Sequence, residues 1–139
     1  MNAPLYTTEI LRLAASLAEP RRLTREDGRA EVRSPTCGSR VSMAVQLDPD
    51  GRVEALSQLV LACAFGQASA ALLERGAAGR NRDEANLALS QLGDWLDGAE
   101  QAPDWPGIAA LTPAYSRKSR HGAILLPFRA LLAAIESAR

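Results

Sequence analysis

Apolar residues recur every three or four positions in four stretches of the chain, and this spacing predicts four amphipathic helices. In chain order, the helices are expected to start at Thr7 or Thr8, after Cys63, at Asn81 or Asp83, and at Pro127. Pro20 should end the first helix, and Gly76 should end the second. The third carries a stripe that we expect to face the core, made of Leu87, Leu89, Leu92 and Leu96.

Polar and apolar residues alternate between the first and second helices, which predicts three short strands over residues 29–33, 41–47 and 52–61. Asp48-Pro49-Asp50-Gly51 has the proline and glycine of a tight turn and should join the last two strands as a hairpin. Gly98 to Pro106 reads as a loop. The order predicts one α+β domain over residues 1–139, with an N-terminal helix, a three-stranded antiparallel sheet and a layer of helices on one face.

Composition and charge exclude several classes of function. The 139 residues include 16 Lys and Arg against 16 Asp and Glu, so the net charge is +0, and aromatic residues make up only 4%. Binding by phosphate neutralisation or by stacking on bases is therefore not expected, which argues against nucleic acid as a partner. The longest apolar run, Leu59 to Phe65, is too short to span a membrane, and residues 1–20 do not resemble a signal peptide. With only two cysteines, a disulfide-stapled secreted scaffold is not expected, and we predict a cytoplasmic protein.

The two cysteines are the first candidates for chemistry. Cys37 precedes Gly38 in the connection between two predicted strands, and a glycine beside a thiol lets a metal or sulfur atom approach the backbone. Cys63 lies where the third strand meets the next helix, and a helix N-terminus favours the thiolate that binds metals and accepts sulfur. The alternative for Cys63 is an inert core residue, because free cysteine is among the most buried residue types.

His121 is the third candidate ligand. It follows the basic run Arg117 to Arg120, which fits either a solvated turn or a docking patch for an acidic partner. Cys37, Cys63 and His121 together could form an open zinc or iron site, although no two of them have a local metal-ligand spacing. The sequence has no phosphate loop, dinucleotide turn or nucleophile elbow, so we expect a protein that is not an enzyme. A thiol enzyme that uses Cys63 is a weaker alternative.

Four segments resemble the U-type iron–sulfur scaffold family, which includes IscU, SufU and the N-terminal domain of NifU. Ser34-Pro35-Thr36-Cys37-Gly38-Ser39 resembles the family's N-P-x-C-G-D, and Asp50-Gly51-Arg52-Val53 is similar to its D-G-R-I turn. Ala62-Cys63-Ala64-Phe65-Gly66-Gln67-Ala68-Ser69-Ala70 resembles G-C-A-I-S-x-A-S-A and is the most specific match. Arg120 to Leu131 resembles R-x-K-C-A-T-L-P-W-x-A-L. The resemblance covers nearly the whole chain, and the order of elements in the family agrees with the order predicted above.

The resemblance implies an iron–sulfur cluster assembly protein that holds iron, a labile [2Fe–2S] cluster or zinc and receives sulfur from a cysteine desulfurase. Apo client proteins would be its other partners, and the family also makes a homodimer an option. The implied ligands are Cys37 and Cys63, with His121 assisting. The family's Asp after the first cysteine is Ser39 here, and its third cysteine is Gly122 or Ala123, depending on the register. The second hypothesis is therefore a degenerate scaffold that docks a desulfurase or client and regulates it without carrying a cluster.

Overall fold

The first helix and the sheet form as the sequence predicts. The computed structural model describes residues 6–35 and 38–138. Helix α1 (Thr8–Ala15) is capped by Thr7, whose hydroxyl accepts a hydrogen bond from the Ile10 N–H at 3.1 Å. It ends one turn before Pro20, because the residue that precedes a proline disfavours the helical conformation. The Ala18 N–H donates instead to the Glu74 carboxylate at 3.2 Å.

Three antiparallel strands follow, in the sheet order β1-β2-β3: β1 (Gly28–Arg33), β2 (Arg40–Leu47) and β3 (Val53–Leu61). The turn between β2 and β3 is the predicted one. The Gly51 N–H donates to the Asp48 carbonyl at 2.9 Å, and Gly51 has a φ of 80°, which favours glycine. The register places Arg33, Arg40 and Leu61 in one row across the end of the sheet.

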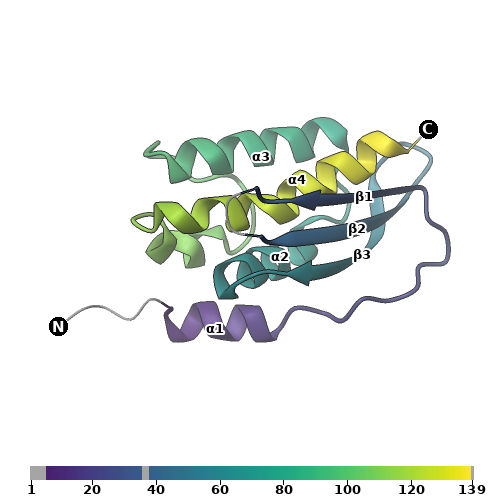
Figure 1. Ribbon diagram of the computed structural model, residues 1–139. Helices are drawn as coiled ribbons and strands as arrows, with labels where there is room; N and C mark the ends of the chain where they lie inside the picture. The colour runs from purple at the N-terminus through teal and green to yellow at the C-terminus, as the bar shows by residue number, and fades with distance from the viewer. Residues whose placement is uncertain (1–5, 36–37, 139) are drawn as a thin grey trace.

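The remaining regular elements of the described chain are helices: α2 (Ala64–Gly76), α3 (Arg82–Leu96), the 3-10 helices η1 (Ile108–Ala114) and η2 (Lys118–Arg120), and α4 (His121–Ser137). Helices α2 and α4 pack against the sheet, α1 packs on α2, and α3 packs on α4. Figure 1 shows the resulting helical layer, with α1 and α3 at its two outer edges. The α+β architecture of a three-stranded antiparallel sheet and one helical layer is confirmed. None of the helices in residues 6–35 and 38–138 combines the length and apolarity needed to cross a bilayer.

Two details of the helix prediction are wrong. Helix α4 begins at His121 rather than at Pro127, and Pro127 lies inside it. A proline removes only one backbone donor from a helix, and the apolar stripe continues upstream through the buried residues Ala123 and Ile124. In α3, Leu87 is 56% exposed, because a period of 3.6 residues places it opposite the buried face. That face consists of Ala85, Ala88, Leu92, Trp95 and Leu96.

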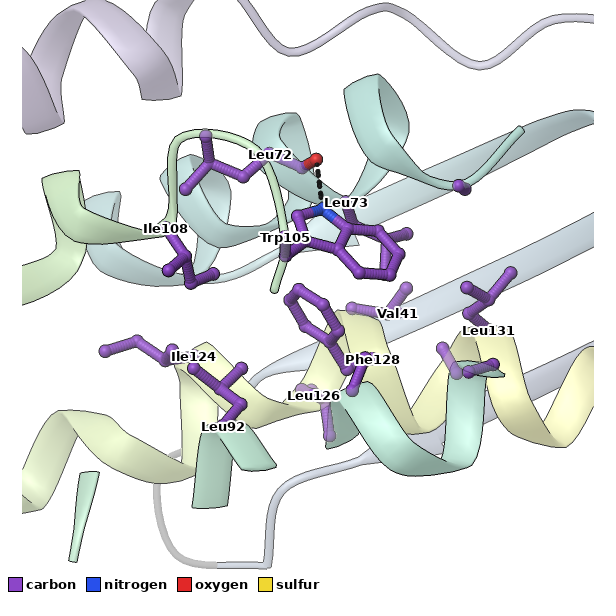
Figure 2. Close-up of a cluster of buried hydrophobic side chains, with 14 of the residues drawn as sticks. Val41, Leu72, Leu73, Leu92, Trp105, Ile108, Ile124, Leu126, Phe128 and Leu131 are labelled. Carbon is purple, nitrogen blue, oxygen red and sulfur yellow. Dashed lines mark hydrogen bonds between the residues drawn. The ribbon is translucent and has the colours of Figure 1, made fainter. Parts of the chain in front are cut away.

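The core lies between the sheet and the helices and extends under the segment that follows α3. Trp105 is buried, and its indole N–H donates to the Leu72 carbonyl at 2.8 Å (Figure 2). Phe128 of α4 meets the Trp105 ring edge to face at 5.0 Å, and the Arg80 guanidinium covers the ring at 4.0 Å. The predicted loop at Gly98 to Pro106 is therefore anchored to α2 and α4 near its end.

Candidate functional site

A cavity of about 160 Å³ opens at the end of the sheet where β3 ends and where α2 and α4 begin. Three segments that are far apart in the sequence form its wall, and they include one of the predicted ligands. The lining residues are Gly38, Ser39, Leu61, Ala62, Cys63, Ser119, Arg120 and Ala123. The sequence does not predict that Ser119 and Arg120 line a cavity with Cys63, and their contribution is a finding of the structure. We call this cavity the cysteine pocket.

Cys63 is the N-cap residue of α2. Its backbone is extended, with φ −68° and ψ 174°, and its carbonyl accepts the Gln67 N–H at 2.9 Å. The Gln67 side chain donates to the Ala62 carbonyl at 3.0 Å and so links the first turn of α2 to the residue that precedes Cys63. The Cys63 side chain makes no capping hydrogen bond, and the residue is half-buried. It therefore lies at the positive end of a helix and in a pocket with polar walls, which argues against an inert core cysteine.

The loop between β1 and β2 forms the second wall. The Ser34 N–H donates to the Ser39 carbonyl at 2.9 Å and closes the loop, and Gly38 adopts a φ of 73° that favours glycine. Ser39 is only 5% exposed, yet it lines the cysteine pocket. Cys37 lies outside the described residues. Its described neighbours Gly38 and Ser39 line the pocket together with Cys63.

The third wall comes from η2 and the first turn of α4. Ser119 and Arg120 line the cavity, and so does Ala123, which is 1% exposed. Ala123 is one of the two positions at which the resemblance places a third cysteine, while Gly122 is not among the lining residues. The pocket geometry thus favours the register in which Ala123 replaces the third cysteine.

His121 has other partners. Its Nε2 lies 3.0 Å from the Ala114 carbonyl oxygen and 3.1 Å from that of Tyr115, and it is not among the residues that line the cysteine pocket. Because both partners are acceptors, Nε2 must carry a proton and donate to them. The structure therefore joins His121 to η1 through this nitrogen, and a ligand role for Nε2 would require both hydrogen bonds to break.

The electrostatics of the pocket differ from those expected of a complete cation site. Among the described residues that line it there is no carboxylate, and the one charged side chain is the Arg120 guanidinium. Within residues 6–35 and 38–138, no group of three or more His, Cys, Asp or Glu side chains is arranged to hold a metal ion. The described residues thus supply one thiol, and a metal site here needs ligands from the Cys37 loop or from another molecule.

A larger cavity of about 310 Å³ lies elsewhere, between the connection after α1, strand β3 and the end of α2. Glu19, Arg21 and Glu74 are its charged lining residues nearest α1 and α2, and neither a cysteine nor the histidine borders it. Size does not identify the site, because this cavity and others on the surface are larger than the cysteine pocket. The sulfur chemistry that the sequence predicts belongs to the smaller cysteine pocket.

Comparison with known proteins agrees with this geometry. No family model and no curated protein matches the sequence. Among solved structures, the N-terminal part of a nitrogen-fixing NifU-like protein from Brucella abortus superposes with a TM-score of 0.87 at 30% identity, over 96% of this chain and 93% of that one.

Two more distant structures share the fold. A protein assigned as an iron–sulfur cluster assembly scaffold of the SUF system, from the thermophile Fervidobacterium islandicum AW-1, gives a TM-score of 0.80 at 18% identity, over 94% of this chain and 96% of that one. A hypothetical protein gives 0.71 at 21% identity, over 92% and 96%. With the Brucella relative at this identity and coverage, and with Cys63 at the start of α2, the chain belongs to the NifU-like N-terminal family of U-type scaffolds.

Proposed function

We propose that this protein works in iron–sulfur cluster assembly and holds iron or a labile [2Fe–2S] cluster as cargo in the cysteine pocket. The observation that carries the proposal is the position of Cys63, half-buried at the N-terminus of α2 in a cavity that the Cys37 loop also borders. Thiolates are the usual protein ligands of iron in such clusters. The NifU-like protein of Brucella abortus and the protein assigned as an iron–sulfur cluster assembly scaffold in Fervidobacterium islandicum support the same role.

The ligand set explains why the cargo would be held weakly. A [2Fe–2S] cluster takes four ligands, and this chain offers Cys37 and Cys63 as thiols. Ser39 stands where the family pattern has an aspartate, and Ala123 lines the pocket where it has a cysteine. A thiolate from a second chain or from a small thiol would complete the set, and His121 would assist only after leaving the carbonyls of η1. The same residues suit zinc with an open position.

The sulfur source that we propose is a cysteine desulfurase, and the recipients are apo client proteins. The pocket is accessible to a macromolecule, because Leu59 and Leu61 at the end of β3 are 46% and 47% exposed. Leu61 also lines the pocket. We place the protein in the cytoplasm, as a carrier rather than an enzyme, and a homodimer is one way to supply further thiolates.

Anaerobic reconstitution tests the cargo proposal. The protein is incubated with ferrous iron, L-cysteine and a cysteine desulfurase, then desalted, and its visible absorption is recorded. We expect sulfur-to-iron charge-transfer absorption that falls strongly in Cys63→Ser and in Cys37→Ser and is retained in the control Ser16→Ala, at the C-cap of α1. Wild-type protein that keeps no iron and shows no such absorption would refute the proposal.

A second candidate function is a docking module that binds a desulfurase or client without cargo. Two features favour it: no carboxylate is found among the pocket-lining residues that the structure describes, and Arg120 places a positive charge at its wall. A pull-down with a desulfurase distinguishes the two functions. Docking without cargo should survive in the double variant Cys37→Ser, Cys63→Ser, whereas loss of the desulfurase from that variant would contradict it.

A further inference from the structure

Ser69 is a fully buried polar residue of α2 that joins this helix to the start of α4. Its hydroxyl donates to the Ile124 carbonyl at 2.6 Å, and the residue has 0% exposure. One turn earlier in α2, Gly66 allows an equally close approach. A Cβ at Gly66 would lie 3.3 Å from the Ala123 carbonyl oxygen and 2.6 Å from the Ala62 Cβ. Two successive carbonyls of α4 therefore face α2 at backbone distance.

Pro127 explains why this part of α4 needs an external contact. A proline has no N–H, so the helix cannot make the usual bond from residue 127 to the Ala123 carbonyl. The proline ring also crowds the carbonyl four residues before it, which weakens the first turns of the helix. The Ser69 hydroxyl bonds to the next carbonyl along, that of Ile124, so the contact from α2 lies one residue beyond the carbonyl that loses its helical donor.

The turn of α4 that Ser69 and Gly66 contact is next to the cysteine pocket. Arg120 and Ala123 lie on the α4 side, Cys63 begins the same helix as Ser69, and all three line the cavity. The opposite end of α4 is held separately: the Ser137 hydroxyl donates to the Ala134 carbonyl at 2.7 Å and accepts the Arg29 N–H of β1 at 2.9 Å. The helix therefore has one hydroxyl contact near the pocket and one far from it.

From these contacts we infer that Ser69 is a positioning residue, which fixes the separation between Cys63 and the first turn of α4 and so sets the width of the cysteine pocket. The inference deepens the proposed function and rests on it for the use of the pocket as a cargo site. Ser69 itself does not line the cavity and acts through Ile124 and the turn that precedes it.

A cobalt titration measures this separation directly. In a Cys37→Ser background, Ala123→Cys adds a thiol to the α4 wall, so that Co²⁺ can be bound between it and Cys63, with thiolate-to-cobalt absorption as the readout. Adding Ser69→Ala should weaken Co²⁺ binding roughly ten-fold, the lower end of the effect of removing a residue that orients metal ligands. Ser137→Ala is the matched control, because it removes a hydroxyl contact of the same helix away from the pocket.

Ser69→Thr and Ser69→Val form a second pair of variants. Threonine and valine have nearly the same shape, but only threonine carries a hydroxyl group. Tighter Co²⁺ binding with threonine than with valine is expected. Equal binding in Ser69→Ala and Ser137→Ala, or in the threonine and valine variants, overturns the inference. Co²⁺ binding between Cys63 and the introduced cysteine depends on the width of the pocket and not on iron. Failure of the wild-type protein to hold iron would therefore refute the proposed function without changing the outcome of the cobalt titration.

Discussion

At the scale of single residues, the cysteine pocket differs from the U-type pattern through small, uncharged side chains. Ser39 and Ala123 line the pocket at the places of a carboxylate and a thiol, and Arg120 adds a positive charge. These differences remove ligands while the wall around Cys63 stays in place. The chain keeps the family fold, and under the proposed function it would hold its cargo with fewer ligands, as a labile cluster requires.

Restoring a thiol at position 123 should increase cargo retention. Ala123 lines the pocket and is 1% exposed, so Ala123→Cys adds one sulfur atom beside the space that Cys63 faces. We expect more iron and more acid-labile sulfide per chain after anaerobic reconstitution and desalting. Gly122→Cys is the matched control, because Gly122 does not line the pocket. Equal retention in the two variants would show that the pocket geometry does not select position 123.

At the scale of elements, helix ends follow local rules that the sequence displays, with the start of α4 as an exception. Asn81 caps α3, and the β2–β3 turn forms at Gly51, both as predicted. Helix α4 starts six residues earlier than the proline rule suggests, and its first turns pack through the buried residues Ala123 and Ile124 and are joined to α2 by the Ser69 hydroxyl. A rule that considers one helix at a time cannot include such contacts with another helix.

Removal of the α3 cap should destabilise the fold by about 1 kcal/mol, the typical cost of replacing an asparagine N-cap by alanine. The Asn81 side chain accepts the Glu84 N–H at 2.9 Å, and the Glu84 carboxylate accepts the Asn81 N–H at 3.2 Å. Urea unfolding of Asn81→Ala measures this loss. Asn86→Ala, an exposed position within the same helix, should leave stability nearly unchanged. Equal losses at both positions would contradict the capping role.

The carboxylates of Asp27 and Glu84 should make the stability of the fold depend on pH in the acid range. The hydrogen bond from Arg25, followed by that from the Leu47 N–H, lowers the pKa of Asp27. The Asn81 N–H, followed by Arg52, lowers the pKa of Glu84. A pKa that is lower in the folded protein contributes stability above the unfolded value of about 4 and loses it as the pH falls through the folded value.

Stability should therefore be steady from neutral pH to about pH 5 and should decline below about pH 4. In the double variant Asp27→Asn, Glu84→Gln, the free energy of unfolding should fall less steeply over this acid range, since its two side chains no longer take up protons. Urea unfolding at a series of pH values measures the slope. An identical slope in wild type and variant would show that these two groups do not control the acid transition.

At the scale of the whole molecule, the sequence predicts the fold better than the site. Alternation in β2, the turn that leads into β3 and helical spacing in α2 are strong local signals, and they place Cys63 between β3 and α2 as the structure does. The partners of His121 could not be predicted, because they are carbonyls of η1 that only tertiary folding brings within 3.0 and 3.1 Å. The prediction for Cys37 lies outside the described residues and remains a prediction.

The most direct test of the central claim is the iron K-edge X-ray absorption of the anaerobically loaded protein. If the cysteine pocket holds the cargo through its thiols, iron–sulfur scattering should dominate the first coordination shell and should weaken markedly in Cys63→Ser at equal iron loading. A first shell of oxygen and nitrogen alone in the wild type, or a spectrum that Cys63→Ser leaves unchanged, would contradict the account.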